Sequence, residues 1–247
     1  MAEYNPFSLI GKTILVTGAS SGIGRGIAVA CSKMGAQVIV TGRNDKRLEE
    51  TLMMMAIGEH NKVVCDLTTD DEVTTMVKKL PLLDGVVHCA GASQRIPCKL
   101  LKKDDVDSLM RVNFSAPVIL QSELMRQKKI RKDGSVVFIA SAAADMPSVS
   151  NAVYSASKGA LISYAKCLAL EVASRKVRVN CISPAMVKTD MILRDGIDEL
   201  KLEEDEAKYP LKRYGTPQDI ANLAIYMLSD ASSWMTGNNV HITGGVS

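Results

Sequence analysis

The chain has 247 residues, of which 47% are hydrophobic and 23% charged, and its formal net charge at pH 7 is only +3. This length suits one large α/β domain or two small ones, and such a small charge gives no argument for nucleic acid as a partner. Three Phe, six Tyr and one Trp are too few aromatic residues to favour a base-stacking platform. No window has the apolar length of a membrane span, and the N-terminus has no basic region followed by an apolar run.

The six cysteines form no CxxC pair and lie mostly in apolar surroundings, which favours buried free thiols over a disulfide framework or a zinc site. The three histidines are not spaced as a set of metal ligands either. We therefore expect no metal centre, and a reducing, cytoplasmic setting is the default expectation.

Strand-like and helical segments alternate from one end of the chain to the other. Strands are predicted at residues 12–18, 37–42, 61–67, 83–91, 134–141, 176–183 and 238–243. Helices are predicted at residues 27–36, 45–58, from Asp70 onward, at 103–129 with a bend or division at Pro117, at 151–174 and at 217–230. Continuous apolar strands are typical of a sheet covered on both faces. The pattern predicts an α/β single-domain Rossmann fold over residues 1–247, with a doubly wound seven-stranded parallel sheet and helices on both faces.

One long irregular region, residues 184–216, follows the sixth predicted strand. A region of this length at the carboxyl end of a strand is a candidate lid over a site, which we place at about residues 186–213. The acidic run EEDE at 203–206 is expected to be a solvated helix face.

A glycine-rich turn, TGASSGIGRG at residues 17–26, joins the first strand to the first helix. Gly18, Gly22 and Gly24 would permit a tight turn and let backbone N–H groups approach a diphosphate at a helix N-terminus. Glycines also form ordinary turns, and this spacing differs from the common G-x-G-x-x-G fingerprint. The position after the first strand of a βαβ unit favours dinucleotide binding.

The stretch YSASKGA, residues 154–160, places Tyr154 and Lys158 four positions apart. On a helix these residues share a face, and an ammonium beside a phenol favours the phenolate. Such a pair can donate or accept a proton near neutral pH. By spacing alone, a surface pair without function is the more common case.

Taken together and in order, these motifs resemble those of the short-chain dehydrogenase/reductase family over essentially the whole chain. TGASSGIG at 17–24 is similar to the family's TGxxxGxG loop, and HCAG at 88–91 to its NNAG motif with both asparagines replaced. The family's Pro-Gly is Pro184–Ala185 here, and its C-terminal TGxxxxVDGG is TGNNVHITGG at 236–245. None of these departures removes a reacting group.

The resemblance implies hydride transfer between a nicotinamide and a carbonyl or alcohol, carried by a tetrad of Asn113, Ser141, Tyr154 and Lys158. Tyr154 would be the general acid/base, with Lys158 assisting it and binding the nicotinamide ribose. Ser141 would hydrogen-bond the substrate oxygen. Asn113 would hold a water of a proton relay, and a structural hydrogen bond is the other interpretation.

The resemblance also implies a set of cofactor-binding residues, in which Asp66 would contact adenine or cap a helix. The second strand ends with Gly42, where an acid would bind the 2′-OH of NAD, and Arg43 follows as a bidentate donor for a 2′-phosphate. NADP(H) is therefore the expected cofactor. The full set is Gly18, Ser20, Ser21, Gly22, Ile23, Gly24, Arg43, Asp66, Leu67, Ala90, Gly91, Tyr154, Lys158, Pro184, Val187 and Thr189.

The substrate pocket is expected between the loop after Ser141, residues 92–98 and the lid, with no fixed charge beside the catalytic groups. Within the family, the chain is most similar to 3-oxoacyl-[acyl-carrier-protein] reductases, which dock an acidic carrier protein. A basic cluster could steer that partner or be a solvated turn; it consists of Lys128, Lys129, Arg131, Lys132 and Arg175.

Two alternatives remain open. Other members of the family act on sugars, steroids or small alcohols, and a non-catalytic NADP(H) sensor on the same fold would be expected to have lost Tyr154 or Lys158. The family commonly forms homotetramers, and the apolar positions in 217–230 and the last strand suit either an interface or burial within one subunit.

Overall fold

The computed structural model describes residues 4–190 and 199–246. Within them, parallel strands form one sheet in the order β3-β2-β1-β4-β5-β6-β7. The strands are β1 Thr13–Thr17, β2 Gln37–Gly42, β3 Asn61–Val64, β4 Leu83–His88, β5 Ile130–Ile139, β6 Arg178–Pro184 and β7 Asn239–Ile242. The helices are α1 Gly22–Lys33, α2 Asp45–Met53, α3 Asp70–Lys79, α4 Lys103–Met110, α5 Ala116–Arg126, α6 Ala152–Val172, α8 Glu199–Glu206 and α9 Pro217–Leu228.

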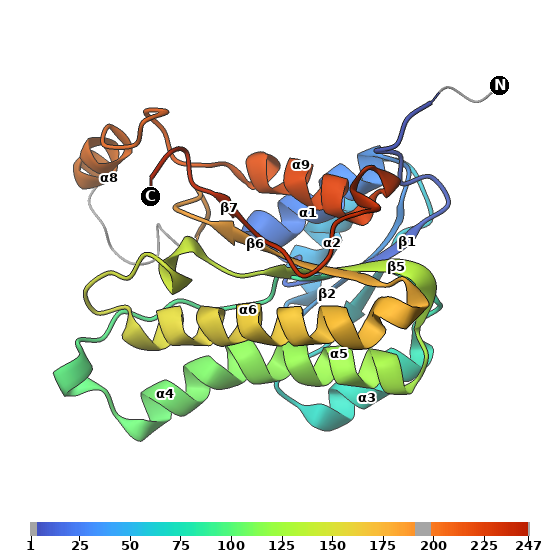
Figure 1. The fold of residues 1–247 in the computed structure, drawn as a ribbon, viewed down its shortest axis with the longest axis horizontal. Helices are drawn as coiled ribbons and strands as arrows, with labels where there is room; N and C mark the ends of the chain where they lie inside the picture. Colours follow the sequence, from blue (N-terminus) through green and yellow to red (C-terminus); the bar gives the residue numbers. More distant parts are fainter. Residues whose placement is uncertain (1–3, 191–198, 247) are drawn as a thin grey trace.

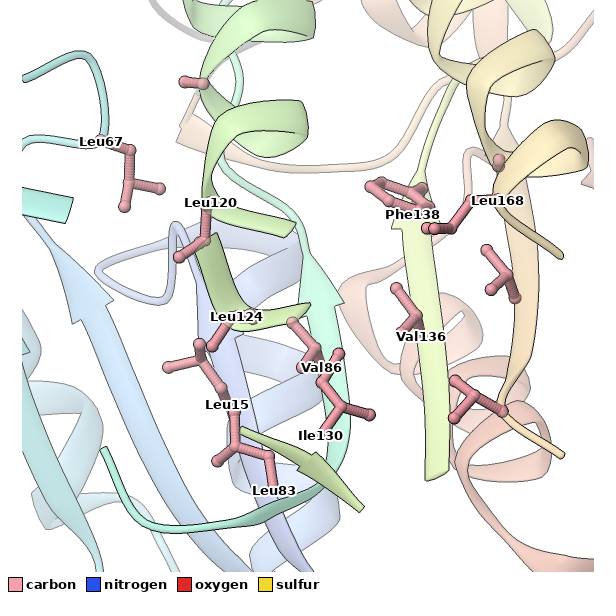
Figure 2. Close-up of a cluster of buried hydrophobic side chains, with 14 of the residues drawn as sticks. Leu15, Leu67, Leu83, Val86, Leu120, Leu124, Ile130, Val136, Phe138 and Leu168 are labelled. Atoms are coloured by element: carbon pink, nitrogen blue, oxygen red, sulfur yellow. The ribbon is translucent and has the colours of Figure 1, made fainter. Parts of the chain in front are cut away.

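Helices cover both faces of the sheet, with α3, α5 and α6 on one side and α1 and α9 on the other (Figure 1). Alternate residues of each strand enter different cores. Leu15 and Val86 pack with Leu120 in the first core (Figure 2), whereas Ile14 and Val87 belong to the second. The continuous apolar strands therefore arise because both faces are buried, and the predicted doubly wound fold is confirmed.

The strand order reverses between β1 and β4. Strand β1 pairs with β2 on one side and with β4 on the other, both in parallel. In an open α/β sheet, ligands bind beyond the carboxyl ends of the strands at such a switch point. The glycine turn leaves β1 there, and the HCAG motif ends β4 there, so the fold brings together the two segments that the sequence singles out.

The predicted division of the helix over 103–129 occurs just before Pro117. Helix α4 ends at Met110, residues Arg111–Ser115 form a π-helical turn, and α5 starts at Ala116. Proline has no N–H, so Pro117 cannot donate to the carbonyl of Asn113 four residues earlier. The irregular turn that results contains Asn113, and π-helical turns are frequent at functional sites.

In the described part of the region expected to be irregular, helix α8 ends with the acidic run. Glu203 and Glu204 are exposed, as expected. Asp205 instead accepts a hydrogen bond from the Tyr214 hydroxyl at 2.7 Å, and Glu206 pairs with Lys188 at 2.6 Å. Half of the run therefore anchors α8 rather than facing solvent.

The thiol expectation holds only in part, because Cys31, Cys65 and Cys181 are buried whereas Cys98 and Cys167 are exposed. The described ranges contain no helix that is both long and apolar enough to cross a membrane. Among the same residues, no cluster of three or more His, Cys, Asp or Glu side chains could hold a metal ion.

Candidate active site

The glycine turn approaches the end of β4 so closely that side chains are excluded. Gly18 has φ +64°, and a Cβ atom on it would lie 2.7 Å from the Cα of Ala90. A Cβ on Gly24 would lie 2.4 Å from the carbonyl oxygen of Gly18. The hydroxyl oxygen of Thr17 accepts hydrogen bonds from the backbone N–H groups of Cys89 and Ala90, at 3.0 and 3.1 Å. The main chain therefore joins the two motifs.

The N-terminus of α1 fits an anionic group. Ser21 stands at the N-cap but makes no side-chain capping hydrogen bond, so the first-turn N–H groups of α1 have no partner from it. Gly22 begins the helix with φ +54°, and a Cβ on it would lie 3.2 Å from the Cγ2 of Thr189. A glycine-lined helix N-terminus of this shape accommodates a diphosphate. The helix N-terminus thus offers N–H donors for the diphosphate of the dinucleotide that the motif predicts.

Three predicted cofactor residues surround the end of β2. Ser20 Oγ would lie 3.6 Å from a Cβ on Gly42, so the glycine turn adjoins the point where Arg43 leaves the strand. Arg43 is exposed. Asp66 accepts from the Thr68 N–H at 2.9 Å and the Thr68 hydroxyl at 2.8 Å, and these hydrogen bonds hold its pKa below the usual value, with Arg43 and Arg111 adding to the effect. Asp66 therefore stabilises a turn before α3.

Two further predicted cofactor residues have buried or core-packed side chains. Leu67 belongs to the first core (Figure 2), and Ile23 packs against the second. Any contact of Leu67 with a cofactor is therefore expected through its backbone.

The predicted acid/base pair lies at the start of α6, beside the end of β5. Lys158 is 5% exposed, and its Nζ donates to the carbonyl oxygen of Ile139 at 2.8 Å. The same Nζ lies 5.9 Å from the centroid of the Tyr154 ring, which is partly exposed. Ser141 follows Ile139 by two residues, and its Oγ accepts from the N–H of Ala143 at 3.1 Å. Accepting this bond leaves the Ser141 hydroxyl hydrogen free to donate.

Asn113 is fully buried in the π-helical turn, and its amide is occupied by structural contacts. Its Oδ1 accepts from the N–H of Ala92 at 2.8 Å, and its Nδ2 donates to the Ala92 carbonyl at 3.0 Å and to Ser157 Oγ at 3.1 Å. The structural role that the sequence left open is therefore present. Any water held by Asn113 would be expected at its backbone carbonyl.

Ser157 is a site residue that the sequence did not single out. It is fully buried, accepts from Asn113, and donates to the backbone carbonyl of Tyr154 at 2.7 Å. It therefore ties the π-helical turn to the helical turn that carries Tyr154. A serine three residues after the tyrosine, where its hydroxyl reaches back to a helical carbonyl, is the signal that could have indicated it.

Gly91 lies where these segments meet. A Cβ on it would lie 3.2 Å from Asn113 Oδ1 and 3.4 Å from Lys158 Nζ. The first residue of the same motif, His88, is buried, stacks on Phe138 and shares a 3.0 Å hydrogen bond with Gln121. Burial lowers the His88 pKa to about 4, so the ring is neutral at pH 7. The side chain of His88, which replaces an asparagine of the family motif, therefore packs in the core. The main chain of the same motif lies at the site.

The remaining predicted cofactor residues lead from β6 into the lid. Pro184 is the last residue of β6, and buried Val187 forms a parallel bridge with Gly215. Thr189 lies over Gly22, as described above. The middle of the predicted lid, residues 191–198, lies outside the described residues.

The loop after Ser141 contains a charged contact that the sequence did not predict. Asp145 Oδ2 lies 2.9 Å from His241 Nε2, and both side chains are about half exposed. His241 belongs to β7, so this contact ties the predicted substrate loop to the last strand.

Comparison with known proteins agrees with this arrangement. A family model described as enoyl-(acyl carrier protein) reductase matches residues 18–247. A 3-oxoacyl-[acyl-carrier-protein] reductase of Rickettsia felis is 34% identical, covering 96% of this chain and 98% of its own. A crystal structure from Brucella melitensis, named a short-chain dehydrogenase/reductase of the glucose/ribitol dehydrogenase kind, superposes with a TM-score of 0.91 at 28% identity, covering 98% and 99% of the two chains.

A second structure, from Beutenbergia cavernae, is provisionally described as an NAD(P)-dependent gluconate 5-dehydrogenase with NADP bound at low occupancy. It has a TM-score of 0.87 and 31% identity, and covers 98% of each chain. The fold and the site define a Rossmann-type oxidoreductase. The chain belongs to the short-chain dehydrogenase/reductase family.

Proposed function

We propose that this protein is an NADPH-dependent carbonyl reductase, able to act in reverse as an alcohol dehydrogenase, in which Tyr154 is the general acid/base. The observation that carries the proposal is the placement of Lys158. Its buried ammonium is held by the Ile139 carbonyl, 5.9 Å from the Tyr154 ring and next to Gly91, where the glycine turn and the π-helical turn converge. A buried cation in this position would stabilise negative charge that develops on the reacting groups during proton transfer.

In the reduction, a nicotinamide cofactor, when bound, supplies the hydride. Tyr154 would donate its phenolic proton to the substrate oxygen as negative charge develops there, and Lys158 would stabilise the phenolate that remains. Ser141 would donate its free hydroxyl hydrogen to the same oxygen. The backbone carbonyl of Asn113 would hold the water through which Tyr154 is reprotonated from solvent.

The preference for NADPH rests on the segment after β2. Gly42 presents no carboxylate that would repel a 2′-phosphate, and Arg43, which follows it, is exposed. An arginine fork matches a phosphate with two hydrogen bonds. The charge of Arg43 contributes to the lowered pKa of Asp66, but the Asp66 carboxylate accepts its hydrogen bonds from Thr68. The remaining cofactor contacts are those proposed from the sequence.

The substrate class favoured is a 3-oxoacyl thioester, in line with the name of the Rickettsia felis relative. The basic cluster would steer an acidic carrier protein, although three of its members also have internal partners. Lys129 donates to the carbonyl of Lys78 at 3.1 Å, Arg175 donates to the carbonyl of Ile130, and Arg131 pairs with Asp84 at 3.4 Å. Steering would therefore depend mainly on Lys128 and Lys132.

A sugar or polyol is the second candidate substrate, because both matched structures carry sugar dehydrogenase names. A non-catalytic NADP(H) sensor is the third candidate, and the intact Tyr154 and Lys158 weigh against it. The homotetramer also stays a prediction. Exposed apolar side chains on the outer helix layer, Ile119 at 43% and Leu170 at 81%, are compatible with it, and light scattering would measure it.

The test is NADPH consumption with acetoacetyl thioesters, free and carrier-linked, beside a panel of ketoses and simple ketones. We expect turnover of a thioester that is abolished by Tyr154→Phe with NADPH binding retained. Turnover of a ketose alone would move the function to the second candidate. Tight NADPH binding without turnover of any carbonyl would establish the sensor.

A further inference from the structure

Arg25, in the first turns of α1, joins the glycine turn to helix α2. Its Nη2 donates to the Ser20 carbonyl at 2.6 Å, to the Arg47 carbonyl at 3.2 Å and to the Glu50 carboxylate at 3.1 Å. Its Nε donates to Thr51 Oγ1 at 3.0 Å. The side chain is 24% exposed. One guanidinium therefore contacts the glycine turn and three residues of α2.

Thr51 extends this connection from the α2 side. It is fully buried, and its hydroxyl lies 2.8 Å from the carbonyl oxygen of Ala19 and 3.0 Å from that of Arg47. Its oxygen also accepts from Arg25, so the hydroxyl links the turn, the helix and the guanidinium. Two successive carbonyls of the glycine turn, at Ala19 and Ser20, are thus held by groups anchored in α1 and α2.

Residues Gly42–Arg43–Asn44 lead from the end of β2 into α2. They carry the proposed recognition of the 2′-phosphate. Asn44 is the N-cap of α2 and accepts from the N–H of Arg47 at 3.0 Å. The position of α2 therefore sets the position of Arg43. The guanidinium of Arg25 is itself paired with Glu50, so its charge is already balanced within the protein.

We propose that Arg25 is a positioning residue that fixes α2 against the glycine turn, and so fixes Arg43, which lies just before α2, relative to the site of a 2′-phosphate. This inference rests on the proposed NADPH preference. Only the planar arginine fork reaches several acceptors at fixed angles, and a lysine would keep the charge without the geometry. Losing the fork leaves the Ser20 carbonyl without this donor and frees α2 to shift.

The test variant is Arg25→Lys, with Arg47→Lys as the matched control, since only the backbone carbonyl of Arg47 takes part in the connection. Calorimetric titration of the full-length protein gives the Kd of NADPH and of NADH, and hydrogen exchange without cofactor reports on residues 18–24. We expect Arg25→Lys to weaken NADPH binding about tenfold and NADH binding only a few-fold. Exchange in the glycine turn should be faster than in the control.

Thr51→Val removes the hydroxyl that links α2 to the glycine turn while keeping Arg25. It should change the two Kd values and the exchange of residues 18–24 in the same direction as Arg25→Lys, but by smaller amounts. It carries the test if Arg25→Lys does not fold. An unchanged ratio of the two Kd values, with exchange at the control level, overturns the proposal.

Arg43→Ala separates this inference from the cofactor assignment. If Arg43→Ala leaves the ratio of the Kd for NADPH to the Kd for NADH unchanged, the assigned phosphate contact is wrong. In that case, faster hydrogen exchange of the glycine turn in Arg25→Lys would show only that Arg25 fixes this turn. If Arg43→Ala raises the ratio of the Kd for NADPH to the Kd for NADH, adding Arg25→Lys should raise that ratio no further. A further rise would mean that Arg25 acts on the phosphate without Arg43, which contradicts the proposal.

Discussion

The two halves of the candidate site are held in different ways. In the predicted cofactor half, the main chain of the glycine turn touches the end of β4, with Gly18 and Gly24 where no side chain fits and Thr17 bonding two backbone N–H groups. In the predicted substrate half, the loop after Ser141 is tied to β7 by Asp145 and His241, whose side chains are both about half exposed.

This difference has a physical consequence. Steric contacts between main-chain atoms cannot be relieved by solvent or salt, because any added atom must displace backbone. Exposed ion pairs are screened and contribute little to the free energy of folding. The cofactor half is therefore expected to tolerate no change of side chain at its closest contacts, whereas the substrate half can exchange its contacts and admit different molecules.

The largest expected effect is at the closest main-chain contact. Gly18→Ala would place a methyl group 2.7 Å from the Cα of Ala90 at a residue with φ +64°. Strain and overpacking together should lower the free energy of unfolding by about 3 kcal/mol or more, and NADPH binding should be lost. Denaturant unfolding and calorimetry would measure both.

Gly159→Ala is the matched control, because a Cβ there has no atom within 4 Å and the residue lies inside α6. Alanine is the better helix former, so stability should be unchanged or rise by about 0.5–1 kcal/mol. Equal losses in the two variants would show that the close approach is not what constrains the cofactor half.

Asn113 should give the next largest effect, since its buried side chain joins the segment after β4 to α6. Asn113→Ala leaves the Ala92 N–H and carbonyl without their partners, and the free energy of unfolding should fall by about 3 kcal/mol. Ser157→Ala removes one of the three hydrogen bonds of the amide and should cost about 1 kcal/mol. A double-mutant cycle on unfolding should show coupling, and strict additivity would refute the shared hydrogen bond.

The backbone of the predicted cofactor half could largely be predicted, because its conformation restricts which residues can occupy each position. A turn with left-handed backbone at Gly18 and Gly22 requires glycine, and the strands read as apolar runs because both faces are buried. Helical spacing predicted that Tyr154 and Lys158 share a face of α6, whereas their proposed roles came from the family resemblance. The π-helical turn was anticipated only as a bend at Pro117.

The substrate half was less predictable because its contacts join residues far apart in the chain. Nothing local to Asp145 indicates a partner on β7, and nothing in the run EEDE shows that Asp205 meets Tyr214 while Glu203 faces solvent. Arg25 was missed for the same reason. Three of its four acceptors lie on α2, and an arginine in a helix is usually solvated.

Acid should destabilise the protein through His88, which lies at the base of the cofactor half. Its pKa in the folded protein is about 4, below the ordinary 6.5, because burial disfavours the charged ring. The unfolded chain therefore binds the proton more readily, and stability is lost as pH falls from about 6.5 to 4, by about 3 kcal/mol at most. Urea unfolding of the wild type and His88→Asn at several pH values would measure this. The variant should lose that part of the pH dependence, and an identical pH slope in both proteins would contradict it.

The smallest expected effect on stability is at the tie of the substrate loop. Asp145→Asn or His241→Gln weakens or removes a half-exposed side-chain hydrogen bond and should change the free energy of unfolding by about 0.5 kcal/mol or less. The KM for the carbonyl substrate should nevertheless rise a few-fold, because the loop after Ser141 loses its link to β7, while the Kd of NADPH stays at the wild-type value. Steady-state kinetics and calorimetry on the wild type and both variants would test this. A change in the Kd of NADPH would mean that the two halves are not independently held, and the comparison between them would fail.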